Sequence, residues 1–386
     1  MTLRTVAVAA LWSGFLWTLA ASAQTATTPA SSPESSVREV ASPAQGEWIA
    51  DQTTKCKLWN QHPRPGETIT WSGDCKQGLA TGSGTTQWFL DGKPNETVVA
   101  NYVDGKLSGK GVITFANGSR YEGTFAENRP NGKGVATFAN GDRYEGDFVN
   151  DKRTGKGLFT WTNGSTYEGE FVDGKRTGKG LYSWADGTRY EGDSVNNERT
   201  GKGLYSWPNG DHYEGDFVNG CFTGIGVFTW ASGNRYEGEF ANNQRSGRGV
   251  WIAKDGDRYE GAFKDGKSTG RGILTWADGS RYEGDFVDGQ RTGKGVWKAA
   301  NGDRYEGDFV DGNFTGKGLL TRTDGSRYEG NFVNGSLTGI GVRLWPNGDR
   351  YDGDLVNNLP NGPGEWTGAN GKKKKGYFVN GVYKGK

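Results

Sequence analysis

A Tyr-(Glu/Asp)-Gly tripeptide recurs eleven times in this chain, and consecutive copies are always 23 residues apart. The first copy begins at Tyr121 and the last at Tyr351, with no insertion or deletion between them. A fixed period without insertions predicts that neighbouring units stack in register, as in a repeat solenoid, and do not fold around one central core. Repeat arrays of this kind present extended binding surfaces, so we expect binding or scaffolding rather than catalysis.

The composition agrees with an ordered array. A hydrophobic content of 33% would on its own fit a disordered chain, but 15 Trp, 16 Tyr and 18 Phe fall largely at periodic positions. The 66 glycines are also periodic, which indicates turns and close packing. With 46 basic and 45 acidic residues, the chain lacks the positive charge that nucleic-acid binding requires.

The N-terminus predicts an export signal. Arg4 precedes an apolar run over residues 6–19, and Ala21-Ser22-Ala23 gives a small-residue cleavage site, so we predict a signal peptide over 1–23. A signal anchor is the alternative interpretation. Residues 24–46 are rich in Thr, Ala, Ser and Pro and are predicted to form a disordered linker. We therefore expect the mature protein to be extracytoplasmic: in the periplasm or cell envelope, or secreted.

The three cysteines fit an exported protein. Cys56 and Cys75 lie in the irregular stretch 47–97, and we predict that a disulfide between them staples this stretch as an N-terminal cap. Cys221 stands in a column that holds lysine in other units, such as Lys152. An incidental exposed thiol is the favoured interpretation of Cys221, and an intermolecular disulfide is the alternative.

Each repeat predicts one β-hairpin. In the unit that starts at Gly157, the pair Asn163-Gly164 lies between apolar and aromatic runs, which favours a two-residue type I′ turn. The second connection, over residues 149–157, is longer and basic. The prediction is an all-β, elongated, single antiparallel sheet of β-hairpin repeats, in which each repeat advances by about 10 Å along a rod of roughly 110 Å.

A two-residue turn at Asn163-Gly164 would pair Thr160 with Tyr167 and Leu158 with Gly169. Since side chains alternate between the faces of a strand, the predicted core face carries Leu158, Thr160, Tyr167, Gly169 and Phe171. The opposite, wetter face is predicted to carry Phe159, Trp161, position 166 (usually Arg), Glu168 and Glu170.

The pattern Tyr-Glu-Gly-Asp-Phe-x-x-Gly followed by Thr-Gly-Lys-Gly resembles the MORN (membrane occupation and recognition nexus) repeat. The resemblance covers residues 98–386 closely and 71–97 loosely. It implies a twisted antiparallel β-array of about twelve repeats that serves as an interaction or dimerisation module, with phospholipid binding proposed for the family. Together with the export signal, it suggests a MORN-repeat protein of an exported bacterial type.

Two columns are candidate binding surfaces. A tryptophan column beside an arginine column is either a set of packing pairs or a ladder on which sugar rings stack: Trp161, Trp184, Trp207, Trp230 and Trp276, with Arg143, Arg189 and Arg235. A column of cations placed on the loops along one edge could meet an anionic surface, or is ordinary loop chemistry: Lys133, Lys156, Lys179, Lys202, Arg248, Arg271, Lys294 and Lys317. The acidic columns are predicted to form a solvated salt-bridge lattice, with calcium binding as the alternative.

Apart from the calcium alternative, nothing in the sequence predicts a metal site, and nothing predicts catalysis or a cofactor. The two histidines, His62 and His212, are far apart, and no nucleophile has a distinctive setting. We expect a non-enzymatic exported scaffold that binds a protein partner or a second copy of itself, and no nucleic acid. The alternative is an envelope module that binds anionic lipid or cell-wall polysaccharide.

Overall fold

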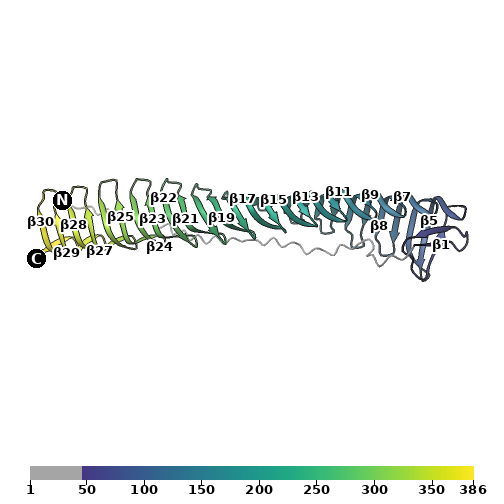
Figure 1. Ribbon diagram of the computed structural model, residues 1–386, viewed down its shortest axis with the longest axis horizontal. Coiled ribbons are helices and arrows are strands. Elements are labelled where there is room, and N and C mark those ends of the chain that lie inside the picture. The colour runs from purple at the N-terminus through teal and green to yellow at the C-terminus, as the bar shows by residue number, and fades with distance from the viewer. Residues whose placement is uncertain (1–45) are drawn as a thin grey trace. The chain divides into compact units, whose positions relative to one another are not determined.

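The computed structural model describes residues 46–386, and these residues form β-strands and turns without any helix (Figure 1). The predicted signal peptide, and the predicted linker apart from Gly46, lie outside the described residues. The described residues divide into two units, 46–243 and 244–386. Within each unit almost every strand pairs antiparallel with the next strand in the chain. The predicted all-β fold of antiparallel hairpin repeats is confirmed.

The first unit begins with strands of irregular length and continues with regular repeats. The irregular strands are β1 (Glu47–Ala50), β2 (Lys57–Asn60), β3 (Glu67–Trp71), β4 (Asp74–Lys76), β5 (Leu79–Leu90), β6 (Lys93–Val103) and β7 (Lys106–Phe115). The regular strands are β8 (Arg120–Ala126), β9 (Arg129–Thr137), β10 (Arg143–Val149), β11 (Lys152–Thr160), β12 (Thr166–Val172), β13 (Lys175–Ser183), β14 (Arg189–Val195), β15 (Glu198–Ser206), β16 (His212–Val218), β17 (Cys221–Thr229) and β18 (Arg235–Ala241).

The second unit repeats the same alternation of a seven-residue strand and a nine-residue strand. Its strands are β19 (Gln244–Ile252), β20 (Arg258–Lys264), β21 (Lys267–Thr275), β22 (Arg281–Val287), β23 (Gln290–Lys298), β24 (Arg304–Val310), β25 (Asn313–Thr321), β26 (Arg327–Val333), β27 (Ser336–Leu344), β28 (Arg350–Val356), β29 (Leu359–Thr367), β30 (Lys373–Val379) and β31 (Val382–Gly385).

The two connections of each repeat are the reverse of the prediction. The two-residue turn lies at Asn150-Asp151, where both residues have positive φ (50° and 70°), as a type I′ turn requires. The Asn163-Gly164 pair instead belongs to a longer loop. In this loop the Gly164 amide donates to the Trp161 carbonyl, the Trp161 amide donates to the Ser165 carbonyl, and only Gly164 has positive φ. That pattern is a type I turn followed by a G1 bulge.

The longer loop shifts the strand register by one residue. Phe159 pairs with Tyr167 and Leu158 pairs with Glu168, so the predicted pairs of Thr160 with Tyr167 and Leu158 with Gly169 are wrong. Because side chains alternate along a strand, a one-residue shift moves the whole β11 segment to the other face. Phe159 therefore lies in the core with Tyr167, and Leu158 lies on the opposite face.

The core is a set of interlocked tyrosine and phenylalanine rings on one face of the sheet, here named the aromatic face. Tyr167, Phe171 and Phe159 are each no more than 3% exposed. The Phe171 ring packs edge-on against Tyr167 of its own repeat at 5.3 Å and against Tyr144 of the preceding repeat at 5.1 Å. Such contacts contribute about 0.5–1.5 kcal/mol each beyond area burial, so every repeat stabilises its neighbour. The predicted tyrosine and phenylalanine rows are confirmed, and the predicted leucine row is not in the core.

A row of glycines lies beneath the tyrosine rings. Gly157 pairs with Gly146 on one side and with Gly169 on the other. A Cβ atom at Gly157 would lie 2.5 Å from the Tyr144 hydroxyl oxygen, so only glycine leaves room for the ring. The Tyr144 hydroxyl donates to the Asp147 carbonyl at 3.1 Å and meets the Thr154 carbonyl at 3.4 Å, where β11 bulges. The glycines thus allow each tyrosine to lie flat and satisfy its hydroxyl on the backbone.

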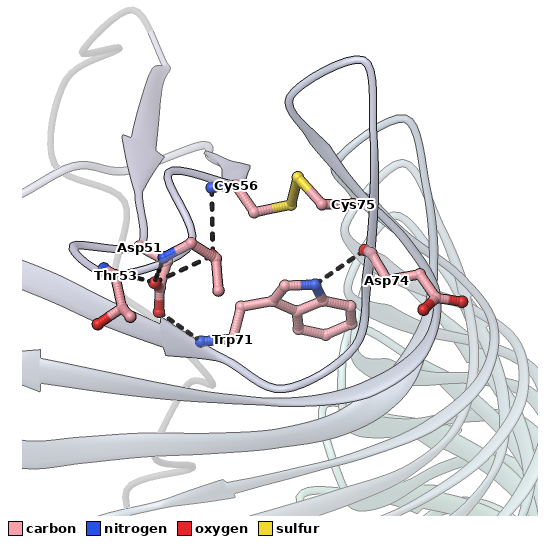
Figure 2. Close-up of a disulfide and its surroundings, with 7 residues drawn as sticks. Asp51, Thr53, Cys56, Trp71, Asp74 and Cys75 are labelled. Atoms are coloured by element: carbon pink, nitrogen blue, oxygen red, sulfur yellow. Dashed lines mark hydrogen bonds between the residues drawn. A yellow bond between two sulfur atoms is a disulfide. The ribbon is translucent and has the colours of Figure 1, made fainter.

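The N-terminal strands form a cap held by the predicted disulfide between Cys56 and Cys75, which is confirmed (Figure 2). Beside it the buried Asp51 carboxylate accepts hydrogen bonds from the Thr53 amide at 2.8 Å and the Trp71 amide at 2.9 Å. The Trp71 indole donates to the Asp74 carbonyl at 3.0 Å. The domain boundary predicted between residues 97 and 98 falls within β6.

Candidate binding surface

The predicted tryptophan and arginine columns lie on opposite faces of the sheet. The Trp161 ring is on the aromatic face, 4.6 Å from Phe159 and 5.0 Å from Tyr182. Arg143 instead extends along the other face and forms an ion pair with Glu145 at 2.6 Å. The predicted neighbourhood of the two columns is therefore wrong, for the same reason that Leu158 and Phe159 exchange faces. The members concerned are Trp161, Trp184, Trp207, Trp230 and Trp276 against Arg143, Arg189 and Arg235.

The indole rings are part of the ring packing. Trp184 lies between Tyr182 of its own repeat at 4.1 Å and Tyr205 of the next repeat at 5.6 Å, so rings of the array approach it on two sides. Stacking of a sugar on this column stays a prediction, and the geometry supplies a packing role that needs no ligand.

A second arginine column was missed by the sequence analysis. Arg176 lies on the aromatic face, with its guanidinium carbon 5.2 Å from the Tyr182 ring and 5.6 Å from the Trp161 ring. Phe222 occupies the same position in a later repeat and stacks on Tyr213 at 3.9 Å. The exchange of arginine for phenylalanine within one column was the available signal, because a column that accepts a large apolar ring faces the core. Further members of this column are Arg153, Arg199, Arg245 and Arg291.

The predicted basic edge lies in the long strands and not in loops. Its members occupy equivalent positions in β9, β11, β13, β15, β19, β21, β23 and β25: Lys133, Lys156, Lys179, Lys202, Arg248, Arg271, Lys294 and Lys317. The side chains project from the face opposite the aromatic face, which we name the charged face. Binding of an anionic surface by this row stays a prediction.

Several of these lysines already have carboxylate partners on the adjacent strand. Lys202 lies 2.7 Å from Asp216, and the same cross-strand pair recurs as Lys133 with Asp147 at 2.8 Å and Lys294 with Asp308 at 2.5 Å. The hydrogen bond from Lys202 holds the pKa of Asp216 below its usual value, with the Ile225 amide as a further donor. These pairs form the predicted salt-bridge lattice and reduce the positive potential of the row.

The charged face of the first unit contains an open groove of about 2070 Å³. The floor of the groove is the backbone of the glycine row. A lysine row runs along one side of this floor, and a row of alternating aliphatic and acidic side chains runs along the other. The aliphatic members are half-buried or exposed and belong to six consecutive repeats: Val112, Val135, Leu158, Leu181, Leu204 and Val227. Seven glutamates and five lysines line the groove: Glu122, Glu145, Glu168, Glu170, Glu191, Glu214 and Glu237, with Lys110, Lys133, Lys156, Lys179 and Lys202. The groove thus combines apolar surface with an excess of carboxylates.

The described part of the chain offers no group of three or more His, Cys, Asp or Glu side chains that could hold a metal ion. Cys221 is a partly buried free thiol in β17. Over residues 46–386, no helix is long and apolar enough to cross a membrane.

Comparisons with known proteins agree with the repeat geometry. The model of the MORN repeat matches twelve consecutive segments: 100–120, 121–143, 144–166, 167–189, 190–212, 213–235, 236–258, 259–281, 282–304, 305–327, 328–350 and 351–373. A comparison with curated protein sequences gives no significant match.

Similar solved structures are distant. They include the Drosophila melanogaster SAS-4 (dCPAP) TCP domain in complex with a proline-rich motif of Ana2, at 12% identity and a TM-score of 0.28, over 46% of this chain and 90% of that one. The wild-type TCP10 domain of Danio rerio CPAP is similar at 13% identity and a TM-score of 0.20, over 62% and 96% of the two chains. These scores are too low to support a functional argument. The twelve matched repeats, together with the regular hairpins, show that the chain belongs to the MORN-repeat family.

Proposed function

We propose that this chain is a non-catalytic scaffold that binds a protein partner through the groove on its charged face. The observation that supports the proposal most directly is the groove itself, in which partly exposed aliphatic side chains recur in six consecutive repeats. An exposed apolar patch that is rimmed by polar residues is typical of an interaction site. The aromatic face, in contrast, is filled by its own rings.

We further propose that the protein works outside the cytoplasm. The sequence of residues 1–23 supports export, and the disulfide between Cys56 and Cys75 fits an oxidising compartment. A MORN-repeat protein of an exported bacterial type would meet these conditions. Anionic lipid and cell-wall polysaccharide are then the competing ligands, through the lysine row or the tryptophan column.

A groove variant tests the protein-binding proposal. Leu158, Leu181 and Leu204 are changed together to Ser, and the matched control changes Val149, Val172 and Val195, which are 49–55% exposed at the turns, in the same way. A partner captured by cross-linking is purified, and its affinity for each variant is measured. We expect the groove variant to lose at least tenfold in affinity and the control to keep the wild-type value.

The competing ligands are tested by co-sedimentation with purified peptidoglycan and with anionic liposomes at low and high salt. Salt-sensitive binding to liposomes that Lys156, Lys179 and Lys202 to Glu changes abolish would favour the lipid alternative. Peptidoglycan binding that fails when Trp184 and Trp207 are changed to Ala would favour polysaccharide. Either result would overturn the proposal if the groove variant also binds the protein partner with wild-type affinity.

A further inference from the structure

The acidic side chains of the groove differ in whether an arginine neutralises them. In eight repeats the carboxylate that directly follows the repeated tyrosine forms an ion pair with an arginine, which stands two residues before that carboxylate in the sequence. The pairs have closest distances of 2.6–2.9 Å: Glu122, Glu145, Glu237, Glu260, Glu283, Glu306, Glu329 and Asp352, with Arg120, Arg143, Arg235, Arg258, Arg281, Arg304, Arg327 and Arg350. These carboxylates have their charge satisfied within their own repeat.

Three consecutive repeats in the middle of the groove depart from this pattern. Glu168, Glu191 and Glu214 are exposed, and within residues 46–386 none of them has an ion pair. The sequence explains two of the three, because Thr166 and His212 stand where the other repeats have arginine. The irregular repeats lie next to one another, so their unpaired carboxylates form one continuous track.

Aliphatic side chains separate the three carboxylates. Glu168 pairs across the sheet with Leu158 on one side and with Leu181 on the other, and Glu191 pairs with Leu181 and Leu204. The track therefore alternates an apolar contact with a negative charge at each strand spacing of about 4.8 Å. A ligand that complements it must be cationic, and must present one positive group for every repeat.

The repeat distance selects the conformation of such a ligand. Equivalent residues of successive repeats lie two strands apart, or about 9.6 Å. A polyproline II helix advances about 9.3 Å in its three-residue turn, whereas an α-helical heptad advances about 10.5 Å. A β-strand places side chains on one face about 6.7 Å apart and cannot keep the spacing.

We propose that the groove binds a basic, proline-rich polypeptide segment of a partner protein, extended as a polyproline II helix with lysine or arginine at every third residue. The cations lie on Glu168, Glu191 and Glu214, and the intervening apolar residues lie on Leu181 and Leu204. This inference rests on the proposed function and names the chemistry of the partner.

Fluorescence anisotropy with the purified full-length protein and defined peptides tests the inference. The probe is a labelled peptide of repeated Lys-Pro-Leu, compared with a scrambled peptide of the same composition, a helical peptide with lysine at every seventh residue, and a Glu-Pro-Leu peptide. We expect saturable binding of the Lys-Pro-Leu peptide, several-fold weaker binding of the scrambled and helical peptides, and none of the acidic peptide.

Two variants locate the site. Changing Thr166 and His212 to Arg introduces the residue that other repeats carry at these positions, so the fold is kept while Glu168 and Glu214 gain partners. Changing Glu168, Glu191 and Glu214 to Gln removes the charges directly. The Arg variant gives partners to two carboxylates and should weaken the peptide about fivefold. The Gln variant removes three charges and should weaken it about tenfold, since each exposed ion pair changes the affinity about twofold. The control changes Glu260, Glu283 and Glu306 to Gln and should leave affinity within about twofold, because arginines already pair with those carboxylates.

Equal loss in the control variant, or equal affinity for the scrambled peptide, would show non-specific charge attraction and overturn the inference. Stronger binding of the helical peptide would overturn the extended conformation. If no basic peptide binds while the purified partner still depends on Leu158, Leu181 and Leu204, the inference fails and the proposed function stands. If partner binding is independent of these leucines as well, both fail.

Discussion

The glycine row gives the sharpest test of how the array is held together, at Gly169. An alanine Cβ built at Gly169 would lie 2.5 Å from the Tyr167 hydroxyl oxygen and 2.7 Å from the Gly180 Cα. Carbon and oxygen atoms need roughly 3.5 Å, so the ring would have to move by about 1 Å. Phe171 blocks this movement on one side, because its ring packs edge-on against Tyr167.

The expected cost of Gly169→Ala follows from three contributions. Overpacking costs about 1–3 kcal/mol, and loss of the hydrogen bond from the Tyr167 hydroxyl to the Glu170 carbonyl costs about 1 kcal/mol. Replacing glycine in a strand returns about 0.5–1 kcal/mol, because alanine loses less backbone entropy. The net expectation is a destabilisation of about 2 kcal/mol in the repeats that contain β12 and β13.

Hydrogen exchange measures this effect repeat by repeat, which suits an array in which unfolding is not all-or-none. The matched control is Gly164→Asn: this loop glycine has a φ of 90° and no atom within 4 Å of an added Cβ, and asparagine tolerates the left-handed region. The control should stay within about 0.5 kcal/mol of wild type. Tyr167→Leu in the Gly169→Ala background should recover part of the loss. Equal protection in the two glycine variants, or strictly additive effects of Gly169→Ala and Tyr167→Leu, would refute the steric explanation.

Three further predictions concern pH and the cap. Burial alone would raise the pKa of Asp51, but hydrogen bonds from Thr54 and Trp71 outweigh burial and lower the pKa. The ionised carboxylate therefore stabilises the cap at pH values above its unfolded pKa of about 4. This stabilisation is lost as the pH falls through the lower pKa of the folded state. Asp51→Asn should therefore destabilise the cap at neutral pH. Hydrogen-exchange protection of the cap amides, measured at decreasing pH, should become similar in the variant and in wild type below about pH 4. Burial raises the pKa of Tyr144 to about 12, so stability should fall as pH rises from about 10 to 12, with tyrosinate absorbance and loss of circular dichroism appearing together. Replacing Cys56 and Cys75 by Ala should lower cap stability by about 3 kcal/mol and leave exchange in β12 onward unchanged, because repeats contact only their neighbours.

The period of 23 residues was enough to predict strands, repeats and the buried tyrosine and phenylalanine rows. The prediction failed at the turns, because an Asn-Gly or Asp-Gly pair occurs in both connections of many repeats and has two structural solutions. At Asp173-Gly174 it forms the two-residue turn, with positive φ at both residues. At Asn163-Gly164 only the glycine has positive φ, and the Asn163 side chain accepts a hydrogen bond from the Ser165 amide. A local motif cannot distinguish these cases, because the choice depends on which register buries Phe159 against Tyr167.

The same one-residue error decided how much of the candidate site could be predicted. The basic row and the acidic columns were found as columns, because each recurs at the same phase of the repeat. Their grouping into a groove depends on which face Leu158 shares with Glu168 and Lys156, and that follows from the register alone. The tryptophan column was assigned to the face of Arg143 for the same reason, although its rings lie among Tyr182 and Phe159.

Regularity and irregularity therefore carry different information in this chain. The tyrosine column over the glycine row does not vary from Tyr121 to Tyr351, and it answers a requirement that these repeats share, which is to pack against the next repeat. Partner recognition needs a position along the array that differs from the others, and identical repeats cannot provide one. Thr166 and His212 break the arginine column in repeats that almost adjoin, and the carboxylates they leave unpaired lie on the face that the core does not use. If partner binding does not change when arginine is introduced at these two positions, specificity must come from another break in the pattern. Ile225, which interrupts the lysine row, is the next such break within the same groove.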